Sequence, residues 1–163
     1  MSDMSVPVSE PSQSLFMRMQ DYEHPVLLNK MEEELGISQE EAQTLFDDVK
    51  KFLALSLTAH QPLAPPHAVD KGWHLFILFT RDYERFCREY CGRFVHHVPE
   101  DPFSTDKDYE SIPRTCSAAS SVFGELSENW CPAGASKCAR PLPPCTHCVN
   151  KCSSKCSGSC KPG

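Results

Sequence analysis

Residues 38–57, SQEEAQTLFDDVKKFLALSL, contain the strongest structural signal in the sequence and decide the fold. Ser38, followed three residues later by Glu41, is a capping box, the pattern that begins a helix. Apolar residues then recur at the period of one helix face: Ala42, Leu45, Phe46, Val49, Phe52, Leu53 and Leu57. Polar residues are expected on the other faces: Glu40, Gln43, Asp47, Asp48, Lys50 and Lys51. The sequence therefore predicts an amphipathic helix over residues 39–57.

A shorter helix is expected upstream of this segment. Pro25 suits a first helical turn, and Gly36 suits a helix end, so residues 25–35 are predicted to be helical. Downstream, the prolines within residues 60–66 interrupt the pattern, because proline has a fixed φ and no N–H. That stretch is expected to be an ordered loop or an extended arm.

The most apolar stretch follows this loop. Residues 69–79 are apolar on every side and contain few β-branched residues, which favours a buried helix over a strand. Thr80 suits an N-cap, so a second helix is predicted from there to a stop at Gly92. One more short helix is expected around residues 117–126. The predicted fold class is all-α, a small domain of about four helices.

Three regions are expected along the chain. Residues 1–20 contain Pro7, Pro11 and several serines with little periodicity, which predicts a flexible N-terminal arm, either disordered or loosely docked. Residues 21–130 are predicted to form the α-helical domain. Residues 131–163 carry almost no aliphatic side chains, so we expect an irregular Cys-rich tail that cannot support a core.

Charge is divided between the body and the tail. Residues 1–130 hold 11 Lys or Arg and 22 Asp or Glu, whereas residues 131–163 hold five Lys or Arg and no acid. An acidic body argues against nucleic acid as a partner, since phosphate binding needs clustered cations. No window approaches the length of apolar sequence that a membrane helix needs, and the first residues do not resemble a signal peptide. We therefore expect no membrane partner and a cytoplasmic location.

A first candidate site lies at the start of the apolar stretch. Asp70 and His74, one helical turn apart, share a helix face with roughly 6 Å between their Cβ atoms. If the second helix folds back at Thr80, Cys87 and the adjacent His96 and His97 could approach them and complete a zinc site. The same residues allow two other interpretations. A neutral histidine could simply be hydrogen-bonded in a core, with Cys87 as a small buried hydrophobe, or the group could perform acid–base catalysis.

A second candidate site is the segment CTHCVNKCSSKCSGSC at residues 145–160. Thiolates bind soft or borderline metals, and the Ser, Gly and Lys spacers let the chain bend around an ion. The expected ligands are Cys145, Cys148, Cys152, Cys156, Cys160 and His147, with Zn or Cu(I) as the metal. Disulfides among the tail cysteines, a reduced tail without metal and modification by another enzyme remain alternatives. By composition alone, the tail resembles metallothionein.

The stretch VDKGWHLFILFTRDYERFCREYCGRFVHHVP at residues 69–99 resembles the signature of the glycine-rich domain-containing protein-like family. The shared residues are Asp70, Trp73, His74, Tyr83, Cys87, Gly92, His96 and His97. The resemblance covers about residues 38–99 and implies a compact α-helical domain, without catalytic residues that can be carried over. This chain has only seven glycines and no glycine-rich region, so the larger architecture of the plant-type members does not transfer.

These observations favour a binding protein over an enzyme. The expected function is that of a small helical protein whose thiolate-rich C-terminal tail binds Zn or Cu(I). One alternative is a metal-dependent enzyme that uses Asp70, His74, His96 and His97. Another is a protein-interaction adaptor whose tail is ordered by zinc or by disulfides. The expected partners are a metal ion and, for the adaptor alternative, another protein.

Overall fold

The computed structural model describes residues 11–99, 103, 105 and 108–130, and within these residues the chain is all-α without a strand. The α-helices are α1 (Ser12–Gln20), α2 (Pro25–Leu35), α3 (Gln39–Thr58), α4 (His67–Leu78), α5 (Thr80–Phe86) and α6 (Ser111–Phe123). A π-helical turn (Cys87–Cys91) continues α5, and a 3₁₀ turn (Glu128–Trp130) follows α6. The predicted fold class is confirmed.

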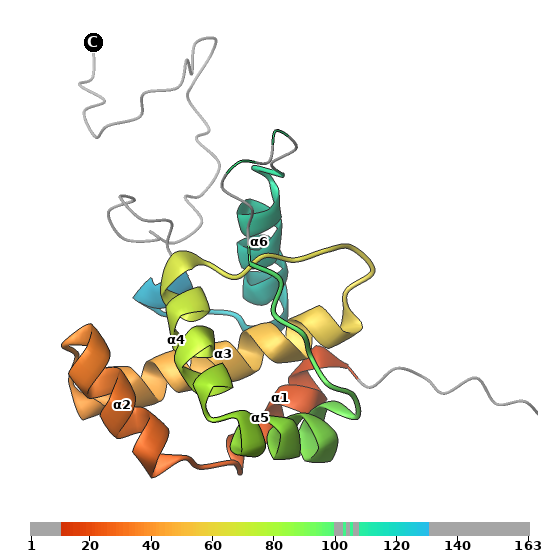
Figure 1. Cartoon of the computed structure of the whole chain (residues 1–163). Coiled ribbons are helices and arrows are strands. Elements are labelled where there is room, and N and C mark those ends of the chain that lie inside the picture. The colour runs from red at the N-terminus through yellow and green to blue at the C-terminus, as the bar shows by residue number, and fades with distance from the viewer. Residues whose placement is uncertain (1–10, 100–102, 104, 106–107, 131–163) are drawn as a thin grey trace, which may run out of the picture.

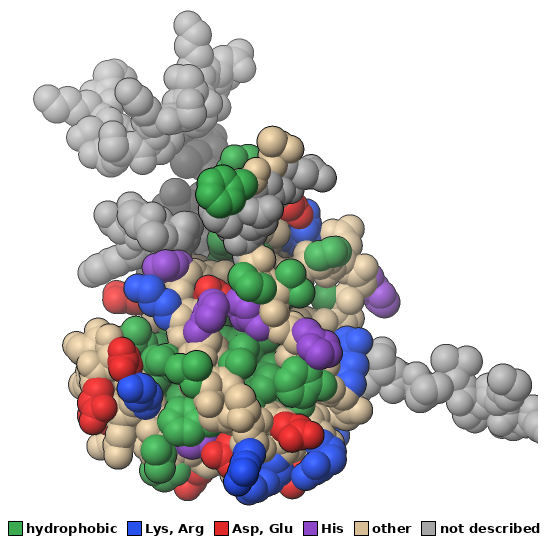
Figure 2. Space-filling view, in the orientation of Figure 1, with side chains coloured by type: hydrophobic (Ala, Val, Ile, Leu, Met, Phe, Trp, Pro, Cys, Tyr) green, Lys and Arg blue, Asp and Glu red, His purple; other side chains and the backbone are tan. Residues whose placement is uncertain are grey.

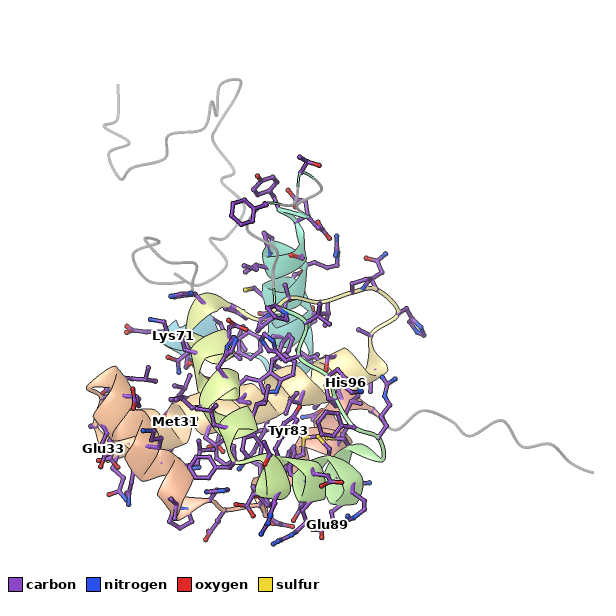
Figure 3. The ribbon with its side chains drawn as sticks, in the orientation of Figure 1. Met31, Glu33, Lys71, Tyr83, Glu89 and His96 are labelled. Atoms are coloured by element: carbon purple, nitrogen blue, oxygen red, sulfur yellow. The ribbon has the colours of Figure 1, made fainter. Side chains whose placement is uncertain are left out.

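Helix α3 is the central element, and α1, α2, α4 and α6 pack against it (Figure 1). Its predicted start is confirmed, because the Ser38 hydroxyl accepts from the Glu41 N–H at 3.2 Å and the Glu41 carboxylate accepts from the Ser38 N–H at 2.8 Å. The predicted apolar face, from Ala42 to Leu53, is buried. In Figure 3, Met31 and Tyr83 point into this core, whereas Glu33, Lys71 and Glu89 point outward.

A glycine sets the crossing of α3 and α4. A Cβ at Gly72 would lie 3.0 Å from Leu45 Cγ and 3.1 Å from Val49 Cγ2, closer than ordinary van der Waals contact. The backbones can therefore approach only because residue 72 has no side chain. Further along the same contact, the Phe46 and Phe76 rings meet edge to face with their centroids 5.2 Å apart. This packing fixes α4, which carries the candidate site.

The break between α4 and α5 lies at Phe79, whose φ of −83° and ψ of 63° are not helical. The prediction of two helices joined at Thr80 is thus confirmed to within one residue. The π-helical turn ends at Gly92, where a φ of 70° favours glycine, as predicted. An extended segment, residues 93–99, then begins, and it runs back toward α4.

The prediction of a flexible arm over residues 1–20 is wrong for residues 12–20. These residues form α1, which buries Leu15, Phe16 and Met19 against the core. The apolar residues of this helix span little more than one helical turn, which is too short to show a helical period in the sequence. The same expectation for residues 1–10, and that of an irregular tail over residues 131–163, lie outside the described residues.

Two residues that we expected on the solvent side of α3 are instead buried. Asp48 is fully buried and accepts hydrogen bonds from the Ser127 hydroxyl and from Asn129 Nδ2, the latter at 2.9 Å. Lys50 lies with its Nζ 4.4 Å from the centre of the Phe46 ring, and burial lowers its pKa. The prediction failed because other segments cover the far side of α3, which is therefore buried on more than one face.

The short helix expected around residues 117–126 is present as α6, but it begins earlier, at Ser111, and ends at Phe123. Among the described residues, no helix combines the length and the apolar character required to cross a bilayer.

Candidate metal centre

The first pair of the candidate site stands at the start of α4. Asp70 lies in the first turn of this helix, and His74 follows one turn later. His74 Nδ1 lies 2.7 Å from the Asp70 backbone oxygen and 3.3 Å from the Asp70 carboxylate atom Oδ2. Donation from Nδ1 to the backbone carbonyl leaves Nε2 of His74 with a free lone pair. The predicted pairing of these two residues is confirmed.

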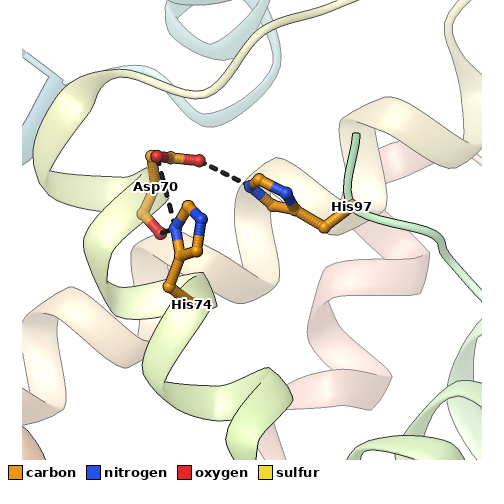
Figure 4. A group of neighbouring side chains, drawn as sticks. All are labelled: Asp70, His74 and His97. Carbon is orange, nitrogen blue, oxygen red and sulfur yellow. Dashed lines mark hydrogen bonds and ion pairs between the residues drawn. The ribbon is translucent and has the colours of Figure 1, made fainter. Parts of the chain in front are cut away.

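The third member, His97, comes from the extended segment 93–99. Its Nε2 lies 2.8 Å from Asp70 Oδ1, and its ring centroid is 4.2 Å from that of His74 (Figure 4). The His97 side chain is 11% exposed, compared with 52% for His74 and 31% for Asp70. The Asp70 carboxylate therefore lies between two imidazoles at the surface of the body.

A chain of hydrogen bonds places His97 beside α4. The Tyr83 hydroxyl donates to the Val95 carbonyl at 2.6 Å and accepts from Trp73 Nε1 at 3.1 Å. The Trp73 ring also contacts the His97 ring, with 4.5 Å between centroids. Because Tyr83 is buried, its pKa is raised and its hydroxyl stays protonated as a donor. The return of the chain at Phe79 and this anchor at Val95 together bring residues 70, 74 and 97 into contact.

Asp70, His74 and His97 can each offer a ligand atom, and these atoms lie within 4.8 Å of one another. In a tetrahedral zinc site, bonds of about 2.0–2.2 Å to imidazole and carboxylate place the ligand atoms about 3.3–3.6 Å apart, so side-chain movements of up to about 1.5 Å would bring the three residues into ligating positions. Two imidazoles and one carboxylate also suit Fe(II) and other first-row metals. The same three residues, called the trio below, also satisfy one another's hydrogen bonds without a metal. In that case their role is to hold the extended segment against α4.

The trio opens into a cavity of about 780 Å³. The cavity lies between α4, the loop before it, the extended segment 93–99 and the ends of α3 and α6. Figure 2 shows histidine side chains gathered in the middle of this face among hydrophobic ones. A metal ion held by three protein ligands would have one or more coordination positions open to water or to a ligand, as in catalytic zinc sites.

Two residues predicted for this site, His96 and Cys87, do not join the group of potential ligands. His96 also lines the cavity, but it is exposed and its ring packs on Phe94 with 4.8 Å between centroids. Cys87 is buried in the core and does not belong to the group of potential ligands. The sequence could not choose between His96 and His97, because adjacent residues of an extended segment point to opposite sides.

Cys87 instead pairs with Cys91 within the π-helical turn. The Cys91 thiol donates a hydrogen bond to the Cys87 sulfur, and the Val95 N–H donates to it as well, which lowers the pKa of Cys87 to about 6. The pKa of Cys91 is raised, because its proton is held in that hydrogen bond and its surroundings are apolar. Both are free thiols.

Sequence analysis did not single out two further residues that line the cavity, His67 and Arg93. His67 precedes Asp70 by three residues, so helical spacing could have indicated it. Arg93 had no such signal. The tail ligands Cys145, Cys148, Cys152, Cys156, Cys160 and His147 lie outside the described residues.

The fold and the trio define an all-α protein with a carboxylate–imidazole cluster at the mouth of a cavity. The sequence model of the UCP032817-like family matches residues 14–122, and the chain belongs to this family. The match contains all six α-helices except the first two residues of α1 and the last of α6, and it contains the whole trio. No curated protein and no solved structure matches the chain.

Proposed function

We propose that the protein is a metal-binding protein whose helical body holds a divalent transition-metal ion, Zn²⁺ in the first instance, through Asp70, His74 and His97. The observation that carries this proposal is the convergence of three potential ligand atoms within 4.8 Å, from two segments of the chain. Partial exposure of His74 and Asp70 gives an ion access to the site. The resemblance to the glycine-rich domain-containing protein-like family adds no function to this proposal.

The Cys-rich tail would bind a second metal ion, Zn or Cu(I), through softer thiolate ligands. This part of the proposal rests on the sequence, which offers Cys145, Cys148, Cys152, Cys156, Cys160 and His147 within sixteen residues. Thiolate ligands must lose their protons, so tail binding should weaken as the pH falls. A reducing compartment such as the cytoplasm would keep these thiols available.

The body site can be tested separately from the tail. In the full-length chain, replacing all seven cysteines of residues 131–163 by serine removes the tail thiolates but keeps Asp70, His74 and His97. We expect this protein to retain one equivalent of Zn²⁺ by elemental analysis. Loaded with Co²⁺, it should give a visible d–d spectrum without the intense near-ultraviolet band of a cobalt–thiolate bond.

A matched pair of variants decides whether the trio holds the ion. In the same background, His97→Gln should weaken Zn²⁺ binding by more than about 100-fold, since even partners outside the ligand sphere cost about 10–100-fold. His96→Gln, one residue away on the same cavity, should bind as the parent does. Equal affinities for these two variants, or no zinc in the parent, would show that the trio is only a structural hydrogen-bonded cluster.

A further inference from the structure

The cavity beside the trio has the size and the lining of a small-molecule site. Its volume of about 780 Å³ falls within the range of about 300–1,000 Å³ typical of ligand pockets. Apolar side chains form much of the wall, among them Trp73, Leu63 and Ile112. Phe94 is 46% exposed and Val98 is 84% exposed beside it, so large apolar surfaces at the edge of the cavity are uncovered.

The polar side chains of the wall are mostly hydrogen-bond donors or cations. Among the described residues, Asp70 is the only carboxylate that lines the cavity, and it is already engaged by His74 and His97. Arg93, His67 and His96 also line the cavity and are exposed. Arg93 forms no ion pair with any described residue, so its guanidinium is available to a ligand. A divalent ion on the trio would add a further net positive charge.

We propose that this cavity binds a small organic anion, a carboxylate attached to an apolar body. The carboxylate would occupy the open position of the metal and face Arg93, while the apolar part would lie against Trp73 and Ile112. The proposal rests on the metal site proposed above. An unpaired guanidinium favours a carboxylate, and the apolar wall excludes a purely hydrophilic anion as the preferred ligand.

The test uses three related probes on the full-length, zinc-loaded protein with the seven cysteines of residues 131–163 replaced by serine. 4-Phenylbutyrate has both the charge and the apolar body, 4-phenylbutyramide lacks the charge, and butyrate lacks the ring. In calorimetric titrations we expect 4-phenylbutyrate to bind at least about tenfold more tightly than either of the others. Inorganic phosphate, a fourth probe, should bind more weakly than 4-phenylbutyrate.

Two variants and one matched control connect binding to the cavity. Arg93→Gln should weaken 4-phenylbutyrate binding about fivefold, the effect of losing one exposed charge pair worth about 1 kcal/mol. Arg88→Gln, on the π-helical turn and outside the cavity lining, should not change it. Ile112→Trp should fill the cavity and remove 4-phenylbutyrate binding while zinc remains bound, which also shows that the variant is folded.

The outcomes separate this proposal from the metal proposal. Normal zinc binding together with equal affinities for the carboxylate and the amide, or tighter binding of phosphate or butyrate, would overturn the organic-anion proposal and leave the metal site intact. The same holds if Arg93→Gln and Arg88→Gln have equal effects. Failure to bind zinc would overturn both proposals.

Discussion

Asp48 is the most completely enclosed carboxylate among the described residues. It accepts from Ser127 and Asn129 and lies 3.4 Å from Lys51 Nζ, so it ties the segment after α6 to the middle of α3. A buried carboxylate survives in a core only when donors surround it. The Asp48 contacts span about eighty residues of sequence, which explains why its burial could not be read from the local pattern of α3.

Replacing Asp48 by Ala should lower the free energy of unfolding by about 2–4 kcal/mol, because it empties a fully buried position and leaves the partly buried donors of Ser127 and Asn129 without this acceptor. Denaturant titration monitored by circular dichroism would measure the change. Gln43→Ala, an exposed position on the same helix, is the control and should stay within about 0.5 kcal/mol of the parent. Equal effects of the two substitutions would contradict the anchoring role of Asp48.

At the scale of elements, the π-helical turn Cys87–Cys91 combines packing with an unusual thiol pair. The hydrogen bond from Cys91 and the N–H of Val95 stabilise the Cys87 thiolate and lower the pKa of Cys87 from an ordinary 9.0 to about 6. Val95 also accepts the Tyr83 hydrogen bond that holds the extended segment. The π-helical turn therefore contacts the extended segment 93–99, which carries His97.

Cys91→Ala should raise the pKa of Cys87 toward its ordinary value, because the main donor to the thiolate is lost. Because Cys87 is buried and closed to reagents, the ¹³Cβ chemical shift of each cysteine, followed by NMR, is the measurement; it should have a midpoint near pH 6 for Cys87 in the parent and above about pH 8 in the variant. Cys116, whose pKa is raised by burial, serves as an internal control with a high midpoint in both proteins.

This substitution also has a predicted effect on stability. Because the folded pKa of Cys87 lies below the unfolded one, its contribution is fully present above the unfolded value near 9.0 and is lost as the pH falls through about 6. The difference in unfolding free energy between the parent and Cys91→Ala should therefore grow from pH 6 to pH 9. A difference that stays constant over this range would mean that Cys87 is not a thiolate in the parent.

Elements with local signals were predicted well, and those that depend on distant contacts were not. The capping box of α3, the Gly36 stop of α2 and the break near Thr80 are all local signals, and the structure contains each of them. Helix α1 buries only three residues, so its periodicity was too short to detect. In the candidate site, Asp70 and His74 followed from helical spacing, whereas the choice of His97 depended on the Tyr83 to Val95 hydrogen bond.

At the scale of the whole molecule, the core closes at Trp130, which is fully buried although it is the last described residue before the tail. A chain truncated after residue 130 keeps every described buried side chain. A chain truncated after residue 126 loses Trp130 and also the donors to Asp48. The helical body therefore extends at least to Trp130, and the expected boundary between residues 130 and 131 stays a prediction.

The fragment 1–130 should unfold with the same midpoint as the full-length chain in the absence of metal. The fragment 1–126 should be less stable by at least about 3–5 kcal/mol, the cost of deleting one large core side chain. Thermal unfolding monitored by circular dichroism compares the three proteins, and Trp130→Ala in the full-length chain separates the side chain from the truncation. Equal midpoints for 1–130 and 1–126 would place Trp130 outside the cooperative core.

The contact between Trp73 and His97 makes the candidate site optically visible without a label. The sequence contains two tryptophans, and only Trp73 lines the cavity, whereas Trp130 is buried at the end of the body. Indole emission is quenched by a neighbouring imidazolium and by paramagnetic Cu²⁺. A positive charge on the His97 ring, or Cu²⁺ bound to it, would therefore lower the fluorescence of Trp73 more than that of Trp130. In a Trp130→Phe protein, the remaining fluorescence would come from one chromophore that touches the site, and occupancy of the site could be followed in real time.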